Sequence, residues 1–95
     1  MTDTYSEISK ALFEGWGFET HSWGEYATAC NMADSRYIQA IPAKNSRVRL
    51  SMFDRTTPGP GHLPDGEVFY DTTNEEGLRV LVDDAACFLA NGELP

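Results

Sequence analysis

The stretch from Asp71 to Gly92, DTTNEEGLRVLVDDAACFLANG, predicts a helix with a signal at each end. Thr73 is a candidate N-cap, and Glu76, three residues later, completes a capping box. Asn91-Gly92 supplies a left-handed stop at the other end. Between these signals, apolar residues recur at helical spacing: Leu78, Leu81, Val82, Ala85 and Leu89. Such a stripe must be buried, so the rest of the chain has to provide a surface that covers it.

The opposite face of this predicted helix is acidic. It carries Glu75, Glu76, Asp83 and Asp84 with only Arg79 against them, and Glu67 and Asp71 lead into it. Closely spaced carboxylates on a helix are either a solubilising surface or a set of charges that can dock on a basic protein. Both interpretations stay open at the level of sequence.

A chain of 95 residues suits one domain, here residues 1–95, with a core of its own. At its start, Thr4 and Glu7 form a second capping-box pattern, and Tyr5, Ile8, Ala11 and Leu12 then fall on one helical face. We expect this helix to end near Gly15. The Gly15-Trp16-Gly17-Phe18 run indicates a corner from helix to strand, with rings that close one edge of the core.

Residues 18–43 fit two periodicities. As strands, Tyr26, Thr28, Cys30 and Met32 alternate with smaller residues, Asp34-Ser35 makes a turn, and residues 36–41 return as a partner strand. As a helix, Ser22 and Glu25 form a capping box before a run of apolar residues. Gly24 and the Asn31, Asp34 and Ser35 breakers disfavour a helix more than a sheet, so strands are favoured for residues 22–34.

The next segment predicts a hairpin. YIQAIPA and RVRLSMF are joined by Lys44-Asn45-Ser46, with Pro42 near the turn. Val48, Leu50 and Met52 point to the core, whereas Arg47, Arg49 and Ser51 point to solvent. Residues 56–66, TTPGPGHLPDG, contain too many prolines and glycines for regular structure, and we expect a flexible exposed loop there. Residues 66–71 form a last short strand.

The predicted fold is therefore α+β: an N-terminal helix, a meander of three or four antiparallel strands, and a C-terminal helix. Both helices should cover one face of the sheet. The other face should be partly open and should carry Arg47 and Arg49.

The net charge of −8 is unevenly distributed. Residues 36–55 hold five basic residues against one acid, whereas residues 1–34 hold one lysine against six acids and residues 56–95 one arginine against eight. The basic residues, Arg36, Lys44, Arg47, Arg49 and Arg55, make a second candidate surface for nucleic acid. The overall charge opposes direct binding to nucleic acid or to an anionic membrane, so neither is expected as a partner.

No catalytic, metal or cofactor site is predicted. His21, Cys30, His62 and Cys87 are scattered singly, without the paired spacing of a zinc site. Neither cysteine nor any serine lies in a recognisable nucleophile motif. The two cysteines and the lack of a signal peptide favour free thiols and a cytoplasmic protein, and no apolar run is long enough to span a membrane.

The leading functional hypothesis is a small non-enzymatic binding protein that occludes a basic surface on a protein partner. A phage or mobile-element inhibitor of a nucleic-acid-handling host defence enzyme, an anti-CRISPR-like role, would fit this size and charge. The candidate aromatic anchors are Trp16, Trp23, Phe53 and Phe69. Two alternatives remain: a ligand-binding domain or enzyme with a site at the 56–66 loop and His62, and an assembly subunit that forms a homodimer through an open sheet edge.

Overall fold

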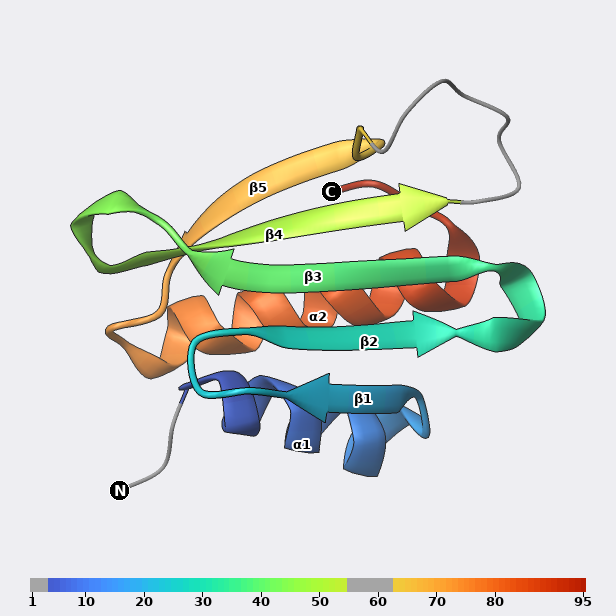
Figure 1. Ribbon diagram of the computed structural model, residues 1–95, viewed down its shortest axis with the longest axis horizontal. Helices are drawn as coiled ribbons and strands as arrows, with labels where there is room; N and C mark the ends of the chain where they lie inside the picture. Colours follow the sequence, from blue (N-terminus) through green and yellow to red (C-terminus); the bar gives the residue numbers. More distant parts are fainter. Residues whose placement is uncertain (1–3, 55–62) are drawn as a thin grey trace.

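The computed structural model describes residues 4–54 and 63–95. They form an N-terminal helix, a meander of five strands and a C-terminal helix (Figure 1). In chain order the elements are α1 (Thr4–Trp16), β1 (Glu19–Ser22), β2 (Ala27–Asn31), β3 (Arg36–Pro42), β4 (Arg47–Asp54), β5 (Gly66–Asp71) and α2 (Glu75–Asn91). This confirms the predicted α+β class and its order of elements.

The sheet is antiparallel throughout, with strand order β1-β2-β3-β4-β5. β3 and β4 form its longest ladder, from Arg36 opposite Asp54 to Pro42 opposite Val48. β1 and β5 are therefore the two edges. The turns that join β1 to β2 and β3 to β4 lie at the same end of the sheet. The start of β2 at Ala27 pairs with the end of β1 at Ser22 and also with Ala40, near the end of β3.

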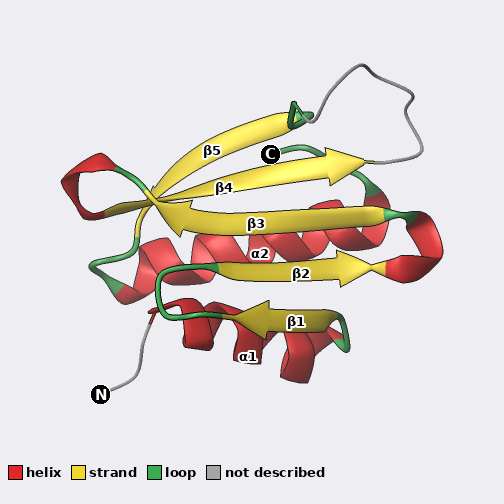
Figure 2. Ribbon diagram, viewed as in Figure 1, coloured by secondary structure: helices red, strands yellow, loops and turns green. Residues whose placement is uncertain are grey.

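Both helices lie on one face of the sheet, as predicted (Figure 2). The core forms between the helices and that face. Its largest fully buried side chains come from α1, α2, β3 and β4: Ile8, Leu12, Ile38, Leu50, Met52, Leu81, Phe88 and Leu89. The side chains of Val48, Leu50 and Met52 are buried, as their alternation in the sequence predicted.

The N-terminal end of α2 differs from the prediction, whereas the C-terminal end agrees with it. The N-cap is Asn74, whose side chain accepts a hydrogen bond from the amide of Gly77 at 2.7 Å, so the prediction of Thr73 as the cap was wrong. Thr73 instead donates to the carboxylate of Asp71 and closes the turn before the helix. The C-terminal stop is confirmed: Gly92 has φ 76° and donates its amide to the carbonyl of Phe88.

Helix α1 continues one residue beyond its predicted end. Gly15 is still helical, and the chain leaves the helix at Gly17, which has φ 76° and donates to the carbonyl of Phe13 at 2.8 Å. The corner is made by Trp16 stacked on Phe18 with ring centroids 6.3 Å apart. Phe18 packs on the core, whereas Trp16 is half exposed.

The preference for strands over a helix in residues 22–34 is confirmed, since β2 occupies Ala27–Asn31 and a single 3-10 turn follows it. The number of strands was underestimated. β1, with the sequence ETHS, has no apolar alternation and is largely exposed, so hydrophobic patterning could not reveal it.

The turn between β3 and β4 is confirmed at Lys44–Ser46, where Asn45 and Ser46 have positive φ. Ser51 was expected to be solvated, but only 4% of it is exposed because neighbouring side chains cover it. Of the 56–66 loop, residues 63–65 precede β5 and Gly66 belongs to it, while residues 56–62 lie outside the described part of the chain. None of the described helices is long and apolar enough to cross a membrane.

Candidate partner-binding surfaces

The acidic residues of α2 divide into two groups. Glu75, Glu76 and Asp83 are exposed on the side of the helix that faces away from the sheet, and we call these three the acidic helix face. Asp84 is only partly exposed, and it accepts a hydrogen bond of 2.6 Å from the hydroxyl of Tyr70 on β5. Asp84 therefore joins α2 to the sheet and is not part of the outward surface.

The two acids on β5 also have partners of their own. The carboxylate of Asp71 accepts hydrogen bonds from the hydroxyl and the amide of Thr73, which lower the pKa of Asp71. Glu67 lies on the face of the sheet that the helices leave open, and its carboxylate is 3.4 Å from Nε of Arg49. The sequence grouped Glu67 with the helix acids, whereas the structure places it on the other side of the sheet.

A groove runs between α1 and α2 beside the acidic helix face. Its floor is apolar and its edges are charged, and its volume is about 270 Å³. The lining residues are Glu7, Ala11, Glu75, Leu78, Arg79 and Val82. Arg79 is 4.0 Å from Glu76, and both side chains are largely exposed, so this ion pair contributes little.

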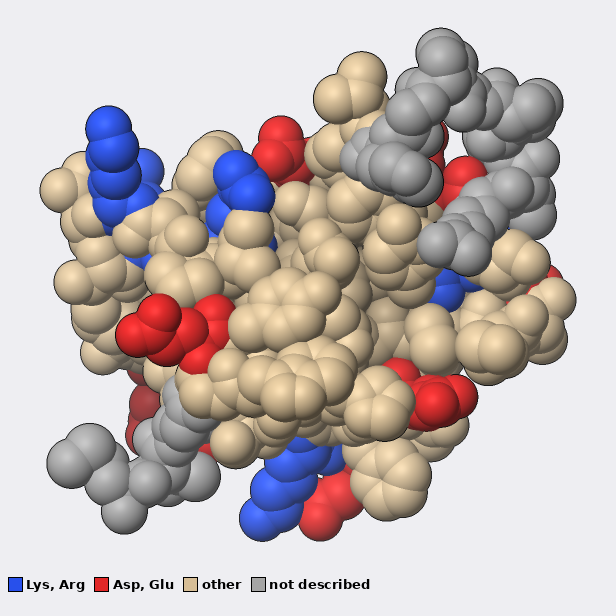
Figure 3. All heavy atoms as spheres, in the orientation of Figure 1, with Lys and Arg blue, Asp and Glu red and all other residues tan. Residues whose placement is uncertain are grey.

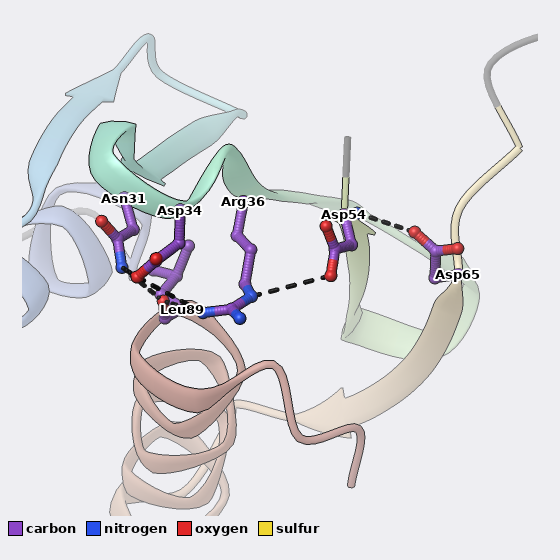
Figure 4. A network of polar contacts seen from close by, with 6 residues as sticks. All are labelled: Asn31, Asp34, Arg36, Asp54, Asp65 and Leu89. Atoms are coloured by element: carbon purple, nitrogen blue, oxygen red, sulfur yellow. Dashed lines mark hydrogen bonds and ion pairs between the residues drawn. The ribbon is translucent and has the colours of Figure 1, made fainter. Parts of the chain in front are cut away.

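The basic residues do not form one surface. Arg36 lies on the helix side of the sheet, where it donates to the carbonyl of Leu89 at 3.3 Å and pairs with Asp34 and Asp54 (Figure 4). Asn31 donates to the same carbonyl at 2.7 Å. Arg36 therefore holds the last turn of α2, and its assignment to an exposed basic face was wrong.

Lys44, Arg47 and Arg49 do lie together, at the β3–β4 turn. With Phe69 they line an open depression of about 440 Å³. Arg49 is paired with Glu67, and Arg47 lies opposite Asp71 in the ladder. Arg55 is outside the described residues. The positive charge of this cluster is thus largely offset on the sheet itself.

The face of the sheet away from the helices carries two of the four aromatic side chains that are exposed in the described residues, Trp23 and Phe69, together with several partly buried aromatic rings. Tyr37 and Phe53 stack with ring centroids 4.5 Å apart, and Trp23 packs on Tyr26 at 5.3 Å. Phe69 is 53% exposed. We call the surface formed by these residues and their neighbours on alternate positions of the five strands the open sheet face. Its centre consists of side chains other than Lys, Arg, Asp and Glu (Figure 3).

The potential metal ligands of the described residues do not gather into one group. Residues 4–54 and 63–95 contain no cluster of three or more His, Cys, Asp or Glu side chains suited to a metal ion. Cys30 and Cys87 are free thiols. Burial, with a smaller effect of Glu19, raises the pKa of Cys30, so it is a neutral thiol at pH 7 and a poor nucleophile. His62 of the alternative loop site is not among the described residues.

Comparisons with protein-family models, with curated protein sequences and with solved structures gave no match. The candidate surfaces are therefore argued from geometry and charge alone. The sequence singled out the acids of α2 and four candidate aromatic anchors, of which Trp16, Trp23 and Phe69 are exposed and Phe53 is partly buried. It did not show that three of the four candidate anchors, Trp23, Phe53 and Phe69, lie across the sheet from the acids. The alternation of strand residues was the signal that could have separated them.

Proposed function

We propose that the protein is a non-enzymatic binding protein that occludes a basic surface on a protein partner, using the acidic helix face and the groove between α1 and α2. The observation that carries this proposal is the groove itself, whose apolar lining of Ala11, Leu78 and Val82 is flanked by two acids, Glu7 and Glu75, against one base, Arg79. This combination suits a Lys or Arg side chain, whose aliphatic stem packs on apolar surface while its charge meets a carboxylate.

The placement of charge supports the same proposal. The basic turn at Lys44 and Arg47 lies at the end of the sheet, beside β5 and the turn at Thr72 and Thr73 that precedes α2. Its arginines are matched with acids of β5: Arg49 pairs with Glu67, and Arg47 lies opposite Asp71. The carboxylates of Glu75 and Asp83 therefore remain available to steer a basic partner.

The class of partner that fits is a cytoplasmic protein with a basic groove, such as a nucleic-acid-handling enzyme whose substrate track would be covered. Carboxylates spaced along a helix reproduce the sign of a phosphate backbone. Inhibition of a host defence enzyme is one biological setting in which a small acidic domain would act in this way.

The test is capture of the partner from an extract of the source cells by the tagged protein, followed by measurement of affinity with the purified partner. Glu75→Lys, Glu76→Lys and Asp83→Lys together should abolish capture. Asp84 must be left unchanged, because its loss would break the hydrogen bond to Tyr70. Raising the salt from about 0.05 M to 0.5 M should release the wild-type complex, since exposed charge pairs are screened.

The matched control reverses three exposed acids elsewhere: Glu14, Glu19 and Glu93. It changes the net charge by the same amount and should retain most of the binding. Equal loss of binding in both triple variants would show that only the total charge matters and would reject the acidic helix face as the site. Circular dichroism of both variants verifies that they are folded.

A further inference from the structure

We propose that the open sheet face is a self-association surface, on which a second copy of this chain packs face to face. The two copies are related by a two-fold axis that runs along β3, between the sheets. This axis places β1 of one copy over β5 of the other. The proposal is independent of the proposed function, because the acidic helix face lies on the opposite side of the sheet.

The first support is the set of aromatic side chains on a face that no described helix covers. Trp23 is 58% and Phe69 53% exposed, and the Tyr37–Phe53 stack lies between them in the order of the strands. Exposed aromatics grouped on a surface whose charged groups lie around the rim are typical of a protein interface (Figure 3).

The second support is that the face is complementary to itself under this axis. The β1–β2 turn, with Trp23 and Glu25, and the β3–β4 turn, with Lys44, are at the same end of the sheet but on opposite sides of β3. The axis therefore brings the ring of Trp23 toward Phe69 of the partner copy, and the carboxylate of Glu25 toward Lys44. A second copy of the chain supplies both the aromatic contact and the charge pair through its own symmetry, whereas a different protein would need its own groups at both positions.

The third support is geometric. An axis along the strands keeps the strands of the two sheets nearly aligned, which is the common mode of sheet packing, with an angle of about 30°. Five strands at a spacing of about 4.8 Å, with an average length of about 20 Å, give a projected face on the order of 500 Å² per copy. The pair then buries about 1,000 Å² or more, which is sufficient for a specific interface.

The experiment is sedimentation equilibrium of the whole chain over a range of concentrations. The wild-type protein should be a dimer at micromolar to millimolar concentration. Phe69→Asp should weaken the dimer by about 30-fold or more, because it replaces the ring that meets Trp23 of the partner copy with a charge that association would desolvate. The matched control is Phe13→Asp, since Phe13 is 60% exposed on α1, on the helix side of the sheet. That variant should dimerise like the wild type.

A charge exchange tests the position of the axis. Glu25→Lys should weaken the dimer by about 10-fold, since the contact with Lys44 occurs twice in a symmetric pair. Adding Lys44→Glu to the same chain should restore the affinity to within about threefold of wild type. Lys44→Glu alone should weaken it.

Three results would overturn the proposal. A wild-type chain that is monomeric up to about 1 mM would assign the open sheet face to a different partner. A dimer that Phe13→Asp breaks and Phe69→Asp does not would place the interface on the helices. A double variant no tighter than Glu25→Lys alone would exclude the two-fold axis along β3.

Discussion

Gly77 shows how one residue in α2 is fixed by its surroundings and not by helix propensity. It lies in the first turn, where alanine would normally stabilise a helix by about 0.5 to 1 kcal/mol. A Cβ atom at this position would, however, lie 1.8 Å from the backbone carbonyl oxygen of Asp71. The end of β5 and the start of α2 are therefore in close contact at this glycine.

We expect Gly77→Ala to destabilise the protein by about 2 kcal/mol or more, because the backbone of Asp71 or the helix must move to admit the methyl group. The control is Gly15→Ala in α1, which meets nothing within 4 Å and should be neutral or stabilising by about 0.5 kcal/mol. Urea unfolding of the two variants measures this difference in sign. Stabilisation by both substitutions would contradict the close approach.

The Tyr70–Asp84 hydrogen bond gives a prediction that depends on pH. Burial, together with this hydrogen bond, raises the pKa of Tyr70 above its value in the unfolded chain. The folded state thus favours the protonated phenol. Its stabilising contribution is complete below about pH 10, the pKa of an unfolded tyrosine, and it decreases as the pH rises above that value.

Tyr70→Phe should lower the free energy of unfolding by about 1 to 2 kcal/mol at pH 7, since Asp84 loses its donor. As the pH rises above about 10, the wild type should lose stability faster than the variant. Urea titrations across this range provide the measurement. Parallel pH profiles for the two proteins would mean that Tyr70 does not titrate differently in the folded and unfolded states.

At the scale of elements, the C-terminal end of α2 depends on β3. Arg36 is mostly buried, and its guanidinium meets the carbonyl of Leu89 and the carboxylates of Asp34 and Asp54. A Cβ on Gly92 would lie 3.0 Å from the same guanidinium. The last turn of the helix is therefore stabilised by hydrogen bonds to a carbonyl group that has no partner within the helix, as well as by its buried apolar side chains.

Arg36→Met should cost about 2 to 3 kcal/mol, because it removes the positive charge between Asp34 and Asp54 and one of the two donors to the carbonyl of Leu89, while keeping most of the aliphatic packing. Hydrogen exchange should accelerate at the last turn of α2, around Phe88 to Asn91, more than at the start of the helix. Arg79→Met, which removes a largely exposed arginine from the same helix, should change stability by less than about 0.5 kcal/mol. Uniform acceleration along α2 would contradict a local role for Arg36.

The elements that could be predicted from the sequence were those with a strong period or an unambiguous end signal. Val48, Leu50 and Met52 identified β4, and Gly92 identified the end of α2. β1 could not be found in this way, because ETHS forms an exposed edge that is held by backbone pairing with β2. Local capping patterns were also ambiguous: Thr73 and Asn74 both suit an N-cap, and the turn at Asp71 selects Asn74.

At the scale of the whole molecule, the sequence showed which charges exist but not which face carries them. Arg36 and Arg49 both belong to the central hairpin, yet their side chains lie on opposite sides of the sheet. Side chains alternate between the two faces along a strand, and the register of β3 and β4 decides which face each arginine shares. Charge grouped by sequence segment therefore misplaced Arg36 and Glu67. The candidate surfaces could be separated only once strand register fixed which side chains share a face.

The two proposed surfaces lie on opposite sides of the sheet, and this arrangement constrains how they combine. In a dimer formed through the open sheet faces, the two acidic helix faces point outward in opposite directions. One compact partner cannot reach both, so dimerisation should give two separate binding sites and no gain from avidity. Disrupting the dimer should therefore leave the affinity of each site unchanged.

With the purified partner, we expect two partner molecules per dimer of the wild type and one per chain of Phe69→Asp, with dissociation constants that agree within about twofold. Isothermal titration calorimetry gives the affinity and stoichiometry, and light scattering gives the mass of each complex. An affinity that falls about 100-fold or more in Phe69→Asp would mean either that one partner spans both copies or that Phe69 contacts it directly. Glu25→Lys separates these two cases, because it weakens the dimer without altering Phe69. If one partner spans both copies, this variant should also bind the partner more weakly. If Phe69 is the contact, the variant should bind with the affinity of the wild type.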